Sequence, residues 1–190
     1  MQGLLLGRRE ALAASLLLGS GLAASAGAAE AGPQAPTGDV HDFDYHVGHW
    51  TSVQRRLRER WIGSTDWDEF TGDTTYVQYL GGAISVDETA FPTKGFAGLT
   101  VRVFNPGRRQ WFIYWIASNK PEMGTPMIGG YDGNRGLFYG DDTDGDLPIK
   151  VRFIRTKRPP DQERWEQAFS RDGGRSWETN WTADFTRFPA

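Results

Sequence analysis

Hydrophobic and polar residues alternate in short runs along most of the chain. In residues 149–153 the apolar side chains alternate with Lys150 and Arg152, and in residues 177–185 apolar and small side chains alternate with polar ones. A period of two is typical of an antiparallel strand with one buried and one polar face. The pattern predicts ten strands, at residues 50–58, 67–79, 82–91, 96–104, 110–118, 126–131, 136–142, 149–157, 163–170 and 177–187.

Turn-forming residues separate these runs, and helical periodicity is nearly absent. Asn105-Pro106-Gly107, Asp132-Gly133 and Asp144-Gly145 favour tight turns between antiparallel strands. After the first thirty residues no segment has a long amphipathic helical period, and at most one turn of helix is expected around residues 40–47. Because short connections join sequential neighbours, the predicted topology is up-and-down.

An open meander of ten strands would leave two unpaired edges. Closure removes both edges, so the predicted fold is all-β, an antiparallel up-and-down barrel of about ten strands. Such a barrel is wide enough to hold a small ligand. A sandwich of two sheets is the competing architecture.

The start of the chain differs sharply from the rest. Arg8 and Arg9 precede an apolar run over residues 13–24, and Ala24-Ser25-Ala26 has the small residues of a signal-peptide cleavage site. The arginine pair with Leu12 resembles a twin-arginine export signal, and an ordinary secretory signal is the alternative.

These features predict three segments. Residues 1–26 are the signal peptide, residues 27–40 form a flexible leader, and residues 41–190 form a single β-barrel domain. We therefore expect a periplasmic or secreted protein with no stable membrane anchor after cleavage.

Composition supports strands and excludes several kinds of site. Aromatic residues make up 13% of the chain, with eight Trp, and there are 24 Gly, which favours strands and tight turns over helices. The absence of Cys excludes disulfides, thiolate metal sites and a Cys nucleophile. The net charge of −3 gives no basic excess, so nucleic acid is not an expected partner.

The two ends of the predicted barrel resemble those of the lipocalins and related calycins. Gly48-His49-Trp50 opens the first strand, and Arg187 follows the last one. The resemblance implies that Trp50 closes one end of the barrel and that the Arg187 guanidinium lies across its indole. Such a cation–π contact contributes about 0.5 to 2 kcal/mol.

Residues 41–187 also resemble a group of bacterial exported proteins of unknown function with a calycin-like barrel. The matching segments are residues 41–50, 138–142 and 165–170. This resemblance supports a calycin/lipocalin-like fold and implies no particular reaction.

Residues 170–177, with the sequence Ser-Arg-Asp-Gly-Gly-Arg-Ser-Trp, resemble the Asp-box turn of sialidase propellers. In such a turn the Asp172 carboxylate accepts backbone N–H bonds and Trp177 packs beneath. A propeller needs repeated blades, so a single copy predicts a structural hairpin between the last two strands.

The three histidines raise the question of a metal site. His41, His46 and His49 lie beside Asp42 and Asp44, and His46 with His49 is the candidate pair for zinc. Local hydrogen bonding at the barrel entrance is the alternative.

Two other features bear on cofactors. A haem would need a ligand such as Tyr139, because no His follows residue 49. Residues 140–146 are rich in Asp, but the position that requires Glu in an EF-hand loop is Phe153. We predict no bound metal and no cofactor.

The barrel lumen is the expected binding site. If Trp177, Trp181 and Phe185 pack outward or into the closed end, residues of opposite parity point polar groups into one cavity with aromatic walls. The predicted ligand-binding residues are Arg56, Glu88, Arg102, Trp115, Tyr139, Arg152, Glu166 and Asn180. A register shifted by one residue turns the same polar side chains to solvent, and that alternative stays open.

We expect the lumen to hold a small, partly apolar molecule. Arg152 or Arg102 would pair with an anionic group, and Trp115 and Tyr139 would line the wall. One alternative is an enzyme that uses the carboxylates of Glu166 or Glu88 for acid–base chemistry, and another is a structural or interaction module with a filled interior. A copurified ligand, a lumen carboxylate of raised pKa and an interior without a cavity distinguish these three functions in that order. The oligomeric state stays open.

Overall fold

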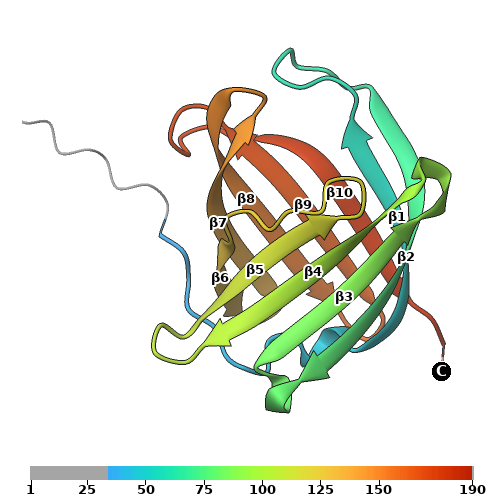
Figure 1. Ribbon diagram of the computed structural model, residues 1–190, viewed down its shortest axis with the longest axis vertical. Helices are drawn as coiled ribbons and strands as arrows, with labels where there is room; N and C mark the ends of the chain where they lie inside the picture. The colour runs from blue at the N-terminus through green and yellow to red at the C-terminus, as the bar shows by residue number, and fades with distance from the viewer. Residues whose placement is uncertain (1–33, 190) are drawn as a thin grey trace, which may run out of the picture. The chain divides into compact units, whose positions relative to one another are not determined.

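The computed structural model describes residues 34–189, which form a closed antiparallel barrel. Each strand pairs with its sequence neighbours, and the first strand pairs with the last (Figure 1). The ten strands are β1 (Gly48–Leu57), β2 (Trp67–Tyr79), β3 (Ile84–Phe91), β4 (Phe96–Asn105), β5 (Gln110–Ala117), β6 (Met127–Asp132), β7 (Arg135–Asp144), β8 (Leu147–Arg158), β9 (Gln162–Ser170) and β10 (Glu178–Arg187). The predicted all-β up-and-down barrel is confirmed, and the two-sheet sandwich is not.

The connections between strands are short. Gly133 and Gly145 have φ of 56° and 63°, the left-handed backbone that the predicted hairpin turns require. Three 3₁₀ helices complete the described elements: η1 (Asp44–His46), η2 (Leu80–Gly82) and η3 (Pro92–Lys94). No helix within residues 34–189 has the length and apolar character needed to cross a membrane. The predicted signal peptide and residues 27–33 of the predicted leader lie outside the described residues.

Trp50 anchors the end of the barrel next to η1, here called the closed end. The Trp50 side chain is buried, and its Nε1 donates a hydrogen bond of 2.7 Å to the His46 carbonyl oxygen. The Arg187 guanidinium lies 4.2 Å from the centroid of the Trp50 ring and donates hydrogen bonds to the Val47 and Tyr45 carbonyl oxygens. The predicted contact between Arg187 and Trp50 is confirmed.

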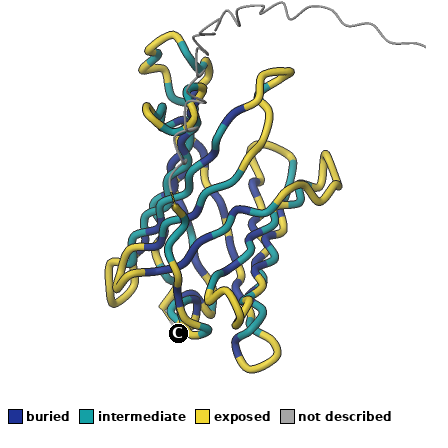
Figure 2. The backbone as a smooth tube through the Cα atoms, turned by 90° about the vertical axis from the view of Figure 1, so that its left-hand side faces the viewer, coloured by how far each residue is buried: buried dark blue, intermediate teal, exposed yellow. Residues whose placement is uncertain are grey.

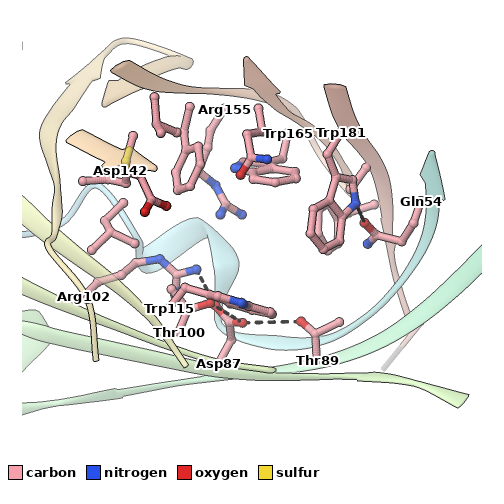
Figure 3. A pocket seen from close by; sticks show the side chains of 18 of the residues that line it. Gln54, Asp87, Thr89, Thr100, Arg102, Trp115, Asp142, Arg155, Trp165 and Trp181 are labelled. Carbon is pink, nitrogen blue, oxygen red and sulfur yellow. Dashed lines mark hydrogen bonds and ion pairs between the residues drawn. The ribbon is translucent and has the colours of Figure 1, made fainter. Parts of the chain in front are cut away.

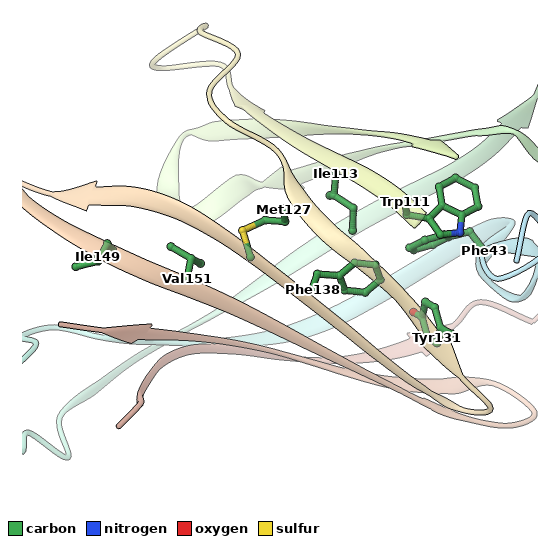
Figure 4. Packing of buried hydrophobic residues seen from close by; sticks show 8 residues of the cluster. All are labelled: Phe43, Trp111, Ile113, Met127, Tyr131, Phe138, Ile149 and Val151. Carbon is green, nitrogen blue, oxygen red and sulfur yellow. The ribbon is translucent and has the colours of Figure 1, made fainter. Parts of the chain in front are cut away.

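The main hydrophobic core lies between η1 and strands β5 to β8. Buried and more exposed residues alternate along the strands, as Figure 2 shows. Phe43, which comes just before η1, packs edge-on against Trp111 and Tyr131, with centroid distances of 4.8 and 5.4 Å. The whole cluster, drawn in Figure 4, comprises Phe43, Trp111, Ile113, Met127, Tyr131, Phe138, Ile149 and Val151. This cluster fills one part of the barrel interior, and a cavity occupies another part of the lumen.

The hairpin between β9 and β10 has the predicted Asp-box structure. The Asp172 carboxylate accepts hydrogen bonds from the backbone N–H groups of Arg175 and Ser176, at 3.0 and 2.9 Å. These bonds hold the pKa of Asp172 well below its usual range. Trp177 Nε1 donates to the Gly174 carbonyl oxygen at 2.9 Å. The motif therefore stabilises the turn between β9 and β10 through local hydrogen bonds.

Candidate functional site

The barrel encloses a cavity of about 230 Å³. At its inner end the cavity reaches Tyr76, Arg102 and Arg155, and at its mouth it reaches Gly124 and Thr125 of the β5–β6 connection. Residues from all ten strands line the cavity. Trp165 and Trp181 lie on one side of it, and Asp87, Thr100 and Arg102 lie on the other side together with Trp115 (Figure 3).

Strands β9 and β10 supply much of the aromatic wall. Trp165 and Trp181 both line the cavity, and their rings meet edge-on with centroids 5.7 Å apart. Phe91 of β3 lies 6.2 Å from the Trp181 ring. Trp181 Nε1 donates to Gln54 Oε1 at 2.8 Å. The aromatic wall therefore offers apolar faces while its indole N–H group has a partner.

Strands β3 and β4 supply the polar wall. Asp87, Thr100 and Arg102 are all buried and line the cavity. Asp87 Oδ2 accepts a hydrogen bond from Thr100 Oγ1 at 3.1 Å, and Asp87 Oδ1 forms an ion pair with Arg102 Nη2. Thr89 of β3 also lines the cavity, and its hydroxyl lies 2.9 Å from that of the buried Thr74 on β2.

Arg102 is the least satisfied of these groups. Its side chain is 1% exposed, and within residues 34–189 its Nε and Nη1 atoms have no hydrogen-bond partner. The guanidinium lies 4.9 Å from the Phe43 ring centroid and 5.2 Å from that of Tyr76. A buried donor without an acceptor costs about 1 to 3 kcal/mol. A ligand oxygen next to Arg102 would recover part of that cost.

The inner end of the cavity also contains a paired network. Arg155 donates from Nε and Nη2 to the two oxygens of Glu163, at 2.7 and 2.9 Å, and from Nη2 to the Tyr76 hydroxyl at 2.9 Å. His46 Nε2 lies 2.9 Å from Glu163 Oε2. All four side chains are buried, and Tyr76 and Arg155 connect the network to the cavity.

Burial and charge set the protonation of this network. Burial alone raises the pKa of Glu163, but the Arg155 charge and then His46 outweigh it and hold that pKa well below its usual range. Burial lowers the pKa of His46 to about 4 and raises the pKa of Tyr76 to about 12. At neutral pH the network therefore has one guanidinium and one carboxylate, with neutral His46 and Tyr76.

Two of the predicted binding residues line the cavity, and two lie beside it. Arg102 and Trp115 are among the lining residues. The Arg56 guanidinium lies 4.9 Å from the centroid of the Trp181 ring. Asn180 Oδ1 accepts a hydrogen bond of 2.9 Å from Gln167 Nε2, and Gln167 lines the cavity. The role of these residues in ligand binding stays a prediction.

The predicted lumen positions of the other four residues are wrong. Glu88 is exposed between the inward-pointing Asp87 and Thr89. Tyr139 and Arg152 are cross-strand partners outside the lumen, where Arg152 lies 4.6 Å from the centroid of the Trp177 ring.

Glu166 is the fourth predicted binding residue that does not face the lumen. It is an acceptor for Arg164 Nε at 3.2 Å, two residues away on the same face of β9, while the alternate residues Trp165 and Gln167 line the cavity.

These four positions were predicted wrongly because the aromatic residues of β10 point inward. Trp181 and Phe185 line the lumen and do not point outward, so the parity expected for the neighbouring strands is reversed. The register between β9 and β10 also shifts between Thr179 and Trp181, and this irregularity changes the alternation at the start of β10.

The structure adds cavity residues that the sequence reasoning missed, among them Asp87, Arg155, Trp165 and Trp181. Hairpin register offered one signal. Arg102 pairs directly with Ser85, and directly paired residues share a face. If Arg102 points inward, Ser85 does too, and so does Asp87, two residues further along β3. Glu88 then points outward.

The three histidines have separate partners. His41 Nδ1 lies 2.9 Å from Asp44 Oδ2, and His49 Nδ1 lies 2.9 Å from Thr75 Oγ1. His46 is turned inward to the buried network described above. In the described part of the chain, no three His, Asp or Glu side chains are grouped to hold a metal ion.

Comparison with known proteins leaves the structure as the main guide to function. No protein-family model matches this chain, and no curated protein sequence matches it. The structure itself defines a class: a closed ten-stranded antiparallel barrel with a cavity in its lumen.

Proposed function

We propose that this protein is an exported, calycin-like barrel that binds a small, partly apolar molecule in its lumen, with a hydrogen-bond acceptor of the ligand next to Arg102. The observation that carries the proposal is the buried Arg102 guanidinium, which lines the cavity and has two nitrogens without a partner among residues 34–189. Pockets that combine apolar walls with a few polar groups are the usual sites of small ligands. Export rests on the signal-like sequence of residues 1–26.

The size of the cavity limits the ligand. The volume of about 230 Å³ is below the roughly 300 to 1,000 Å³ of typical ligand pockets. An apolar cavity of about 150 Å³ accommodates benzene. A single aromatic ring or short alkyl chain with a polar arm therefore matches the lumen in size.

The charge balance of the polar residues indicates an acceptor more than a net negative charge. Arg102 is paired with Asp87, and Arg155 with Glu163. The two guanidinium charges are thus compensated, while Nε and Nη1 of Arg102 have no acceptor in the part of the chain that the structure describes. Amide, carbonyl, hydroxyl and carboxylate oxygens can all accept hydrogen bonds from such donors.

Two alternatives have less support. A filled interior is at odds with the cavity. Acid–base catalysis by Glu88 or Glu166 is at odds with their outward positions. The pKa of the buried Glu163 is lowered, whereas a general acid at neutral pH needs a raised one. Binding is therefore the function that the cavity supports best.

Intrinsic tryptophan fluorescence can test the proposal, because Trp115, Trp165 and Trp181 line the cavity. Three matched probes are 3-phenylpropanamide, 3-phenylpropanoate and 3-phenylpropylamine, of which only the protonated amine lacks an acceptor. We expect saturable changes with the amide or the carboxylate and none with the amine. Arg102→Lys should weaken binding about tenfold, because Lys keeps the charge but loses the planar set of donors.

Arg152→Lys is the matched control, since Arg152 lies on β8 and faces outward, where it packs over the Trp177 ring. It should leave probe affinity unchanged. Equal binding of all three probes, or equal affinity in wild type and Arg102→Lys, would contradict the proposal. So would the absence of saturable binding together with a native mass spectrum free of any copurified ligand.

A further inference from the structure

The outer face of strands β2 to β5 is unusually apolar for a solvent-facing surface. Val77, Val86, Val101 and Tyr114 are directly paired across these four strands. They alternate with residues that point into the barrel, such as Arg102. The four side chains therefore form one row across the outside of the barrel.

A second row runs parallel to the first. Tyr79, Ile84, Val103 and Phe112 are directly paired across the same four strands. Tyr79 is 56% exposed and Val103 is 36% exposed. We call these two rows of four residues, eight in all, the apolar outer face. Its apolarity is the counterpart of the polar inner wall, since β3 and β4 turn their Asp, Thr and Arg side chains inward.

The outer face on the other side of the barrel is different. There, on β8 to β10, Arg164 and Arg158 both contact Asp184, at 2.7 and 3.5 Å. Ordinary monomers expose only small apolar patches, and larger ones mark interaction sites. The contrast within one barrel therefore points to a contact surface on β2 to β5.

The extent of the face suits a protein interface. Leu99 and Ile116 are paired and add a shorter third row. Four strands spaced about 4.8 Å apart and three rows spaced about 7 Å apart cover roughly 400 Å² of flat sheet. Side-chain relief and a polar rim bring this close to the roughly 500 Å² per partner of the smallest specific interfaces.

Charges lie at the two ends of the face. Glu88 is exposed and pairs directly with Leu99 in the third row. Arg108, in the β4–β5 turn at the opposite end, lies 5.6 Å from the centroid of the Phe112 ring. A membrane surface would favour several basic residues around the face. One acidic and one basic end instead suit a protein partner with the same two charged ends.

We propose that the apolar outer face is the interface of a symmetric homodimer in which two barrels pack face to face, with the open end of one over the closed end of the other. A two-fold interface uses the same patch on both copies, and an apolar surface complements itself. In this orientation Glu88 of one copy approaches the partner's Arg108. The reverse orientation would place like charges together. The proposal does not depend on ligand binding in the lumen.

Sedimentation equilibrium of the purified protein provides the first test. We expect a dimer at micromolar concentration. Val103→Glu should raise the dimer dissociation constant at least about hundredfold, because each dimer would bury two unpaired charges. Val53→Glu is the matched control, because Val53 is a 43% exposed valine on the outside of β1, away from the apolar outer face. The dimer dissociation constant of this variant should equal that of the wild type.

Charge reversal tests the orientation. Glu88→Lys should weaken the dimer, and Glu88→Lys combined with Arg108→Glu should restore it. Because the chain has no Cys, single cysteines give a second measurement without a destabilising charge. Val101→Cys should cross-link two copies with a short thiol-reactive reagent, and Val53→Cys should not.

A monomeric wild-type protein throughout the micromolar range would overturn the proposal. Equal dissociation constants for Val103→Glu and Val53→Glu would do so as well, as would cross-linking of Val53→Cys in preference to Val101→Cys. These measurements report mass and not fluorescence, so their failure is separate from failure of lumen binding.

Discussion

The closed end of the barrel and the lumen contain similar residues in different states of pairing. At the closed end, the Arg187 guanidinium covers the Trp50 indole and donates to two carbonyl oxygens. In the lumen, Arg102 keeps two nitrogens without acceptors among the described residues, and Trp115 is 38% exposed. Unsatisfied groups reduce stability and are typical of sites that bind something. The closed end therefore contributes stability, whereas the lumen has the unpaired donors on which the proposed binding site rests.

The two buried arginines show this difference most directly. Arg155 makes two hydrogen bonds to Glu163 and one to Tyr76, whereas Arg102 has its ion pair with Asp87. Both are nearly inaccessible to solvent. Burial alone therefore does not distinguish a structural arginine from a candidate binding arginine, but the number of satisfied donors does.

The largest effect should come from breaking the paired network. Arg155→Met leaves the buried Glu163 carboxylate with His46 as its remaining ion-pair partner within residues 34–189. Removal of one partner of a buried ion pair costs about 3 to 5 kcal/mol. Urea unfolding at neutral pH measures this loss. Arg155→Met combined with Glu163→Leu should recover part of it, because no unpaired charge is then buried. A single-variant loss below about 1 kcal/mol would contradict the assigned role of the network.

The strands and the barrel were predictable because their signals are local. Turn sequences such as Asp144-Gly145 and the alternation in residues 149–153 are each contained in a few positions. Every expected strand has its counterpart in the structure. Closure follows from the need to pair the two edges. The Trp50–Arg187 contact came from the resemblance to calycins and agrees with the structure.

The inward face of each strand was harder to predict because it depends on distant pairing. On β3, Val86 points outward and Asp87 inward, the reverse of the usual alternation for a half-buried strand. The inward Asp87 is stabilised by Arg102, which lies on the next strand. A polar inner wall of this kind is recognisable only when both strands and their register are considered together.

A second, smaller effect concerns pH. Burial lowers the pKa of His46 from 6.5 to about 4, so between these pH values the unfolded state binds a proton that the folded state does not. Stability should therefore fall as pH decreases from 6.5 to 4, by up to about 3 kcal/mol. Urea midpoints measured across this range report the slope.

His46→Gln removes the titrating group and should flatten the dependence between pH 6.5 and 4. The lowered pKa of Glu163 adds a loss of stability at pH values below the usual carboxyl range, and this part should persist in the variant. His49→Gln is the control, because His49 contacts Thr75 outside the buried network. If His46→Gln keeps the wild-type slope, the buried imidazole is not its source.

The smallest effect compares two arginines that each lie over a tryptophan. Arg187 lies 4.2 Å from the Trp50 ring centroid at the closed end, and Arg56 lies 4.9 Å from the Trp181 ring centroid beside the cavity. Arg187→Met should cost about 1 to 2 kcal/mol, because it removes hydrogen bonds to carbonyl oxygens as well as the cation–π contact. Arg56→Met should cost less than about 1 kcal/mol, since its contact is more exposed. Thermal or urea unfolding of the two variants side by side decides this. Equal losses would mean that the closed end is no better stabilised than the wall of the cavity.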